Sequence, residues 1–212
     1  MTPETESDTR ERILDAARTA FRESGTSGAR MQEIADAAGV NKALLHYYFR
    51  NKETLAAGVF TRELGRLVRP VFETLGSGAT LDEKVRRVVG LYLDTLSEFP
   101  GLPAYVLAEI HFHPERLEDF LGQVTEGDPR DRAAGVFRVL DGQLEAAAAE
   151  GRIRPVTAHE FVVNLVSLCV FPFAAAPLLR VLTGGDDALG HLMEARRERL
   201  PEFFMAGLEG RP

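Results

Sequence analysis

Residues 31–49, MQEIADAAGVNKALLHYYF, contain the spacing that decides the fold. Small and apolar residues occupy one face of a short helix, and an apolar face continues at helical spacing beyond Gly39. Ala35 is small enough for two helices to cross closely, Gly39 permits a turn with positive φ, and Leu45 packs the second helix against the first. The stretch therefore predicts a helix-turn-helix, whose second helix is free to enter the major groove of DNA.

The rest of the chain is predicted to form a series of helices. No stretch alternates apolar and polar residues with a period of two, so no strand is predicted. Three pairs of residues have the spacing of an N-terminal capping box: Asp8 with Glu11, Thr80 with Glu83, and Thr157 with Glu160. The predicted fold class is all-α, with about nine helices. A three-helix N-terminal helix-turn-helix domain precedes a larger helical C-terminal domain.

The composition agrees with a folded globular protein. Hydrophobic residues make up 45% and charged residues 27% of the 212 residues. The single cysteine, Cys169, excludes an intramolecular disulfide framework and a multi-cysteine zinc site. Residues 1–8 are polar and acidic, which excludes a secretory signal and predicts a flexible tail.

One uncharged segment, residues 161–179, is long enough by itself to raise the question of a membrane span. Pro172 and Pro177 lie within it, and no basic cluster flanks either end. A helix that is apolar all round is also what the centre of a bundle requires. We therefore expect a buried helix, no membrane partner and a cytoplasmic location.

The formal net charge of −7 argues against nucleic acid only as an average. Residues 9–55 contain eight basic and six acidic residues, a net charge of +2. Residues 56–212 contain 17 basic and 23 acidic residues, and the first eight residues add three carboxylates. A mildly basic helix-turn-helix domain therefore precedes an acidic C-terminal domain.

Residues 9–55 resemble the N-terminal domain of the tetracycline-repressor (TetR/AcrR) family. Family sequences read AGVS-K-G-x-LYxYF-x-x-KE-x-L, and this chain reads AGVNKALLHYYFRNKETL. The resemblance covers about a quarter of the chain. The matching residues are Ile13, Ala16, Ala17, Phe21, Gly25, Ile34, Ala35, Ala38, Gly39, Val40, Leu45, Tyr48, Phe49, Lys52, Glu53 and Leu55.

The resemblance implies a set of DNA-contacting residues around the second helix. Asn41 would cap that helix or touch a phosphate, and Lys42 would contact a phosphate or a base edge. Tyr48 and Phe49 are expected in the core. The complete set of predicted DNA contacts is Arg30, Asn41, Lys42, Ala43, Leu44, His46, Tyr47 and Lys52.

Individual roles within this set follow from side-chain chemistry. Ala43, Leu44 and Tyr47 would face the DNA, and Leu44 offers an apolar contact without hydrogen-bonded base readout. His46 and Lys52 would hold phosphates. The family commonly has two hydroxyl residues where this chain has Ala29-Arg30, so the usual hydroxyl cap is missing and Arg30 could reach a phosphate instead.

The resemblance also implies that residues 56–212 dimerise and bind a small effector. Helices expected at about 157–182 and 187–208 carry large apolar faces, and two from each subunit could form a four-helix interface. A twofold dimer would present two recognition helices to a pseudo-palindromic operator.

Aromatic and polar residues in the middle of the chain supply the composition of a ligand pocket, with a plain core as the alternative. The predicted pocket residues are Tyr92, Phe99, Tyr105, Glu109, His113, Phe137, Asn164 and Phe171.

Glu109 and His113 are also spaced by four residues, which would place them on one helical face as potential metal ligands. The sequence offers no obvious further ligand cluster, so two partly exposed histidines near a helix end are the favoured interpretation. We expect no metal and no cofactor.

Together these features predict a ligand-responsive transcriptional regulator that acts as a homodimer. A repressor is the leading interpretation, while an activator remains open because operator position decides between them. The alternative is a helical adaptor that contacts proteins alone. An enzyme is not expected, because the sequence has no G-x-S-x-G, Walker or Rossmann motif.

Overall fold

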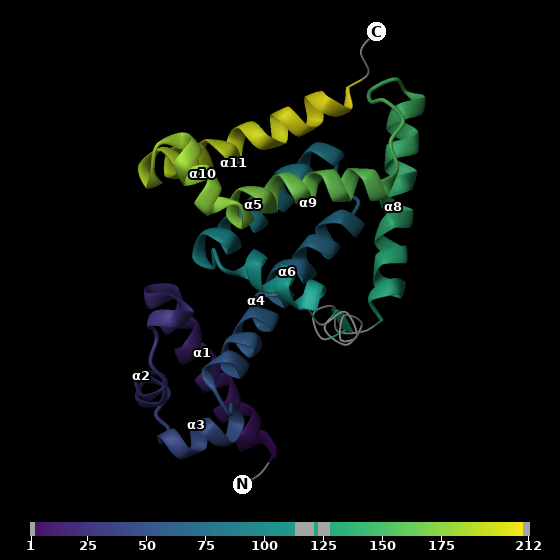
Figure 1. Cartoon of the computed structure of the whole chain (residues 1–212). Coiled ribbons are helices and arrows are strands. Elements are labelled where there is room, and N and C mark those ends of the chain that lie inside the picture. The colour runs from purple at the N-terminus through teal and green to yellow at the C-terminus, as the bar shows by residue number, and fades with distance from the viewer. Residues whose placement is uncertain (1–2, 113–120, 123–127, 210–212) are drawn as a thin grey trace. The chain divides into compact units, whose positions relative to one another are not determined.

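The computed structural model describes residues 3–112, 121–122 and 128–209, and the regular structure in these residues is entirely helical (Figure 1). The all-α prediction is therefore confirmed. Ten helices lie in the described residues: α1 Pro3–Gly28, α2 Met31–Ala37, α3 Lys42–Tyr48, α4 Lys52–Gly76, α5 Leu81–Glu98, α6 Leu102–Phe112, α8 Pro129–Ala149, α9 Ala158–Ala174, α10 Ala176–Thr183 and α11 Asp186–Leu208.

The chain divides into two compact units, Met1–Leu64 and Gly65–Pro212. The first unit contains the predicted helix-turn-helix domain, residues 9–55, together with the first half of α4. Its core is one cluster in which α1 packs on α2 and α2 packs on α3. The buried members are Ile13, Leu14, Ala17, Phe21, Ala29, Ile34, Ala35, Ala38, Leu45, Phe49, Leu55 and Val59.

The first helix begins earlier than the sequence indicated. α1 starts at Pro3, so the predicted helix start at Asp8 is wrong and Asp8 lies inside the helix. The residues before Asp8 carry no apolar periodicity to reveal a helix, but proline is compatible with the first turn. Gly25 has φ 66° and ψ 169°, which interrupts the helical geometry three residues before α1 ends at Gly28.

The C-terminal unit is built around α5, which packs against both α9 and α11 (Figure 1). Capping boxes stabilise the starts of α5 and α9. The Thr80 side chain accepts from the Glu83 backbone while the Glu83 side chain accepts from Thr80, and Thr157 and Glu160 do the same. The capping-box predictions at these two positions are confirmed. α5 buries its apolar stripe, Val85, Val88, Val89, Tyr92, Leu93 and Leu96, beneath α9 and α11.

The apolar segment near the C-terminus is two helices rather than the single one expected over residues 157–182. α9 ends at Ala174, and α10 continues at an angle of 73° to it. Pro172 has no N–H to offer the carbonyl of Leu168, four residues earlier. Arg196 of α11 donates to that carbonyl at 2.6 Å.

Of the helices in the described residues, none is by itself long and apolar enough to cross a membrane, and α9 and α10 reach that length only as this bent pair.

Candidate DNA-binding surface and effector pocket

The turn between α2 and α3 is held by backbone hydrogen bonds and one side-chain cap. Gly39 has φ 65°, and its N–H donates to Asp36 O at 3.1 Å, while Val40 N–H donates to Ala35 O at 3.0 Å. Asn41 then caps α3, because its Oδ1 accepts from Leu44 N–H at 2.8 Å. The predicted turn at Gly39 and the capping of the second helix by Asn41 are confirmed.

Packing beneath α3 decides which of its faces is free. Leu45 is fully buried against Ala35 and the rest of the α1–α2 core, and Phe49 is buried at the end of the helix. The opposite face points to solvent. Lys42, Ala43, His46 and Tyr47 are exposed on this seven-residue helix, whereas Tyr48 packs partly against the core.

The outward face of α3 gathers most of the predicted DNA contacts. Lys42, Ala43 and His46 are exposed, and Leu44 is half-buried. Tyr47 is 73% exposed and rests edge-on against Tyr48, with ring centroids 5.4 Å apart. With Asn41 at the N-cap, six of the eight predicted residues lie on or directly before this one helix.

His46 has one ring nitrogen already engaged. Its Nδ1 lies 3.1 Å from the carbonyl oxygen of Arg50, beyond the end of α3. A proton on Nδ1 donates to that carbonyl, so the other ring nitrogen is the atom that can meet a phosphate. That nitrogen donates to a phosphate only when the ring is doubly protonated.

The two predicted contacts outside α3 are placed differently from each other. Arg30 is the N-cap residue of α2 and lies 3.6 Å from Glu33, with both side chains mostly exposed, so the ion pair is weak and the guanidinium can exchange it for a phosphate. Lys52 is half-buried at the start of α4. Its Nζ donates to Ser27 O at 3.0 Å and to Ala29 O at 3.3 Å.

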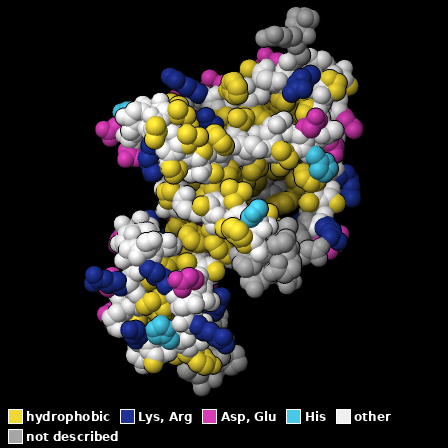
Figure 2. All heavy atoms as spheres, viewed as in Figure 1, with side chains coloured by type: hydrophobic (Ala, Val, Ile, Leu, Met, Phe, Trp, Pro, Cys, Tyr) yellow, Lys and Arg dark blue, Asp and Glu magenta, His cyan; other side chains and the backbone are white. Residues whose placement is uncertain are grey.

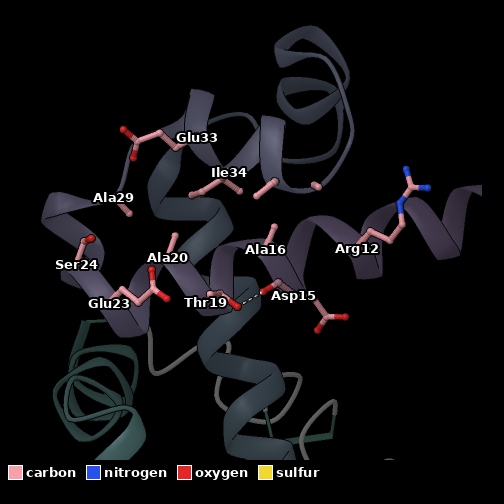
Figure 3. Close-up of a pocket in the computed structure, with 12 residues that line it drawn as sticks. Arg12, Asp15, Ala16, Thr19, Ala20, Glu23, Ser24, Ala29, Glu33 and Ile34 are labelled. Atoms are coloured by element: carbon pink, nitrogen blue, oxygen red, sulfur yellow. Dashed lines mark hydrogen bonds between the residues drawn. The ribbon is translucent and has the colours of Figure 1, made fainter.

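A cavity of about 570 Å³ also lies in the first unit, between α1 and α2 (Figure 3). Small side chains such as Ala16, Ala20 and Ala29 leave the space open, and charged side chains such as Arg12 and Glu23 stand at its margin. None of the eight predicted DNA contacts lines it. The cavity and the outward face of α3 are therefore made of different residues.

The predicted effector-pocket residues that the structure describes lie in different surroundings. Tyr92 and Phe99 are buried in the core, and burial raises the pKa of the Tyr92 hydroxyl. Tyr105 on α6 and Phe137 on α8 are half-buried, and Phe137 stacks on His159 at 4.2 Å between ring centroids. His113 lies outside the described residues, as does the side chain of Glu109.

Asn164 and Phe171, two further predicted pocket residues, lie on the side of α9 that is opposite Val162. Phe171 is 58% exposed, and Asn164 lines a cavity of about 280 Å³ with Leu168 and residues of α11. Asn164 lies two positions after Val162, or about 200° around the helix, so the two residues face opposite ways. The structure thus separates Asn164 from the half-buried apolar flank of α9, which consists of Val162, Val166, Val170 and Phe173.

Figure 2 shows a hollow lined with hydrophobic side chains in the part of the molecule that contains α6, α8 and α9. The apolar flank of α9 is half-buried. Among the described residues, no group of three or more His, Cys, Asp or Glu is placed to hold a metal ion. The hydrophobic side chains in the hollow can offer apolar contact to a ligand.

The last two predicted helices, expected to carry large apolar faces, leave an open apolar surface between α9 and α11. Two cavities of about 270 and 280 Å³ adjoin there, since Leu168 and Phe203 line both. Phe203 is 69% exposed and Leu192 is 41% exposed, while arginines edge the apolar floor. Pro172 leaves the carbonyl of Leu168 without its helical donor, and Arg196 donates to that carbonyl at this surface. We define the α9–α11 surface as Asn164, Ser167, Leu168, Leu192, Arg196, Arg199 and Phe203.

Comparison with known proteins agrees with this geometry. Residues 13–59 match the family model described as bacterial regulatory proteins, tetR family. An uncharacterized HTH-type transcriptional regulator of Mycobacterium tuberculosis is 32% identical over 171 residues, covering 74% of this chain and 85% of that protein. The fatty acid metabolism regulator protein of Bacillus subtilis is 25% identical over 142 residues, covering 67% and 69%. The transcriptional regulator FadR of Bacillus subtilis, solved in complex with stearoyl-CoA, superposes with a TM-score of 0.52 at 19% identity and covers 94% of this chain and 99% of that one.

Proposed function

We propose that this chain, which belongs to the TetR family and is a transcriptional regulator with an N-terminal DNA-binding domain, is a ligand-responsive repressor that binds a pseudo-palindromic operator as a homodimer. The outward face of α3 carries the proposal. A capped helix with one buried anchor and an exposed lysine, histidine and tyrosine has the chemistry to meet phosphates and base edges in a major groove.

Homodimerisation is supported by the α9–α11 surface. A monomer would leave Phe203 and Leu192 in water beside two apolar cavities. A second copy related by a twofold axis could bury both residues on each side. Dimerisation matters for affinity because each DNA-binding domain contributes a net charge of only +2.

An effector with a substantial apolar part is supported by the hydrophobic hollow near α6, α8 and α9. The relatives named above include a fatty acid metabolism regulator and a regulator solved with stearoyl-CoA, so an acyl chain is the ligand class we propose first. Such a ligand would release DNA only by binding the DNA-free conformation more tightly than the DNA-bound one.

The proposal is tested by selecting bound sequences from a random duplex pool and then titrating the selected site at several salt concentrations. We expect an inverted repeat whose half-site centres lie about one helical turn apart, and an affinity that falls as salt rises. A pool that yields no enriched sequence, with binding to proteins alone, would instead support the helical adaptor. Release of the selected DNA by a long-chain acyl-CoA, and not by free CoA, tests the ligand class separately.

A further inference from the structure

Lys52 makes contacts that a simple phosphate-binding lysine would not need. It is the first residue of α4, and its Nζ donates to the carbonyl oxygens of Ser27 and Ala29, at 3.0 and 3.3 Å. A lysine ammonium has three donors, so two of them are used within the DNA-binding unit. The side chain is also half-buried, whereas Lys42 on α3 is exposed.

The two carbonyls belong to the place where α1 ends and α2 begins. Ser27 lies in the last turn of α1, whose carbonyls have no partner further along the helix. Ala29 lies in the link to α2, and its side chain is buried in the core of the unit. Lys52 therefore supplies hydrogen bonds where the backbone needs them.

The link between α1 and α2, residues 29–30, lacks the side-chain cap that usually stabilises a helix start. Gly25 departs from helical geometry just before it, with φ 66° and ψ 169°. Arg30 is the N-cap of α2, yet within the described residues its side chain makes no capping hydrogen bond. A serine or threonine at an N-cap would accept from the backbone of the helix it starts. With that cap missing, an anchor from α4 has more to contribute.

We propose that Lys52 is a positioning residue of the DNA-binding unit: its ammonium ties the start of α4 to the α1–α2 link, rather than neutralising a phosphate of the operator. This inference rests on the proposed DNA binding. Through the link, Lys52 sets where α2 begins and so how α2 supports α3, which packs against it. It replaces the phosphate contact expected for this residue from the family resemblance.

Salt dependence separates the two roles. Each phosphate that a lysine neutralises contributes about −0.9 to the slope of log affinity against log salt concentration. A positioning residue lowers affinity without changing that slope. Lys42→Met and Lys52→Met remove the same charge from the same unit, so they form a matched pair.

We expect Lys42→Met to flatten the slope by about 0.9 per subunit and to leave thermal unfolding unchanged. Lys52→Met should keep the wild-type slope, lower the unfolding midpoint by about 2–4 °C and speed hydrogen exchange at the amides that begin α2. A flattened slope for Lys52→Met would overturn the proposal, whatever its unfolding midpoint. An unchanged midpoint and exchange rate would overturn it as well.

Lys52→Gln gives an independent test, because glutamine is neutral but its amide keeps two N–H donors directed toward the same carbonyls. We expect it to restore most of the midpoint and affinity lost in Lys52→Met. A glutamine variant as defective as the methionine variant in both would overturn the proposal. If the wild-type protein bound no DNA, the proposed function would fail, while the midpoint and exchange measurements would still decide whether Lys52 anchors the link.

Discussion

Both units of the molecule place a lysine against the carbonyls of a helix end, but they bury it to different degrees. In the DNA-binding unit, Lys52 is half-buried beside the end of α1. In the C-terminal unit, Lys84 is fully buried, and its Nζ donates to Leu75 O near the end of α4 and to Gln143 Oε1 of α8, both at 2.6 Å. Gln143 in turn donates to Ala79 O at 3.1 Å.

The two lysines differ in how far water can replace their hydrogen-bond partners. A buried cation loses its hydration, which lowers the pKa of the Lys84 ammonium and makes its two hydrogen bonds indispensable. A half-buried lysine can replace a lost partner with water. The C-terminal unit is therefore held by interactions that cannot be exchanged, whereas the DNA-binding unit keeps its functional side chains at the surface.

Lys84→Ala should have the largest effect. It leaves the Leu75 carbonyl and the Gln143 side chain without their donor and opens a cavity, so we expect a loss of about 3 kcal/mol in the free energy of unfolding, measured with denaturant. Lys84→Met keeps most of the volume and should lose about half as much. If Lys84→Ala lost less than about 1 kcal/mol, the contrast between the two lysines would disappear.

Tyr47→Ala should show the opposite pattern, with affinity reduced and stability preserved. Tyr47 is 73% exposed on the face proposed to meet DNA, so we expect operator affinity to fall by about 10- to 100-fold with an unchanged unfolding midpoint. Tyr47→Phe serves as the control that isolates the hydroxyl. Full affinity of both Tyr47→Ala and Lys42→Ala at physiological salt would mean that α3 does not enter the groove.

Glycine-to-alanine substitutions should have opposite signs in the two units. At Gly58 a Cβ would lie 3.1 Å from Leu14 Cδ2 and 3.2 Å from Phe49 Cε1, and both neighbours are buried, so we expect a net loss of about 1 kcal/mol. At Gly142 on α8 a Cβ would meet nothing within 4 Å. That substitution should stabilise by about 0.5–1 kcal/mol through helix propensity. Thermal unfolding of both variants tests the pair, and a stabilised Gly58→Ala would show that the packing of the first unit is loose.

The smallest expected effect is a pH dependence. Because burial lowers the pKa of Lys84, the unfolded chain binds more protons than the folded chain between that lowered pKa and the ordinary value of 10.5. Stability of the wild type should therefore rise with pH in that window, relative to Lys84→Met, which has nothing to titrate there. Denaturant unfolding of both proteins between pH 7 and 10 measures the difference, and parallel curves would contradict it.

The DNA-binding unit could be predicted because its contacts are close in sequence. Ala35, Gly39 and Leu45 define a turn and its packing over eleven residues, and periodicity alone shows which face they share. The predicted cap at Asn41 followed from the same register. Lys52 was assigned to a phosphate by resemblance, since nothing local indicates that its ammonium reaches back to Ser27.

The C-terminal unit could be predicted only at the level of its helices. Which side chains of α9 share a surface depends on how α8 and α11 pack around it: Asn164 lines a cavity with residues of α11, and Phe171 is exposed. The break after α9 likewise involves Arg196 of α11, which donates to the Leu168 carbonyl in place of the N–H that Pro172 lacks. Such pairings lie far apart in sequence, so residue type and spacing do not reveal them.

The one cysteine gives the molecule an internal reporter of its own opening. Cys169 on α9 is fully buried, and burial raises the pKa of its thiol to about 12, so the folded protein offers thiol reagents neither access nor a thiolate. Reaction must wait until α9 lifts from α5, and its rate therefore measures that local event in the unmodified chain. Any molecule that fills the hollow beside α9 would be detected as slower labelling, before its identity or its effect on DNA is known.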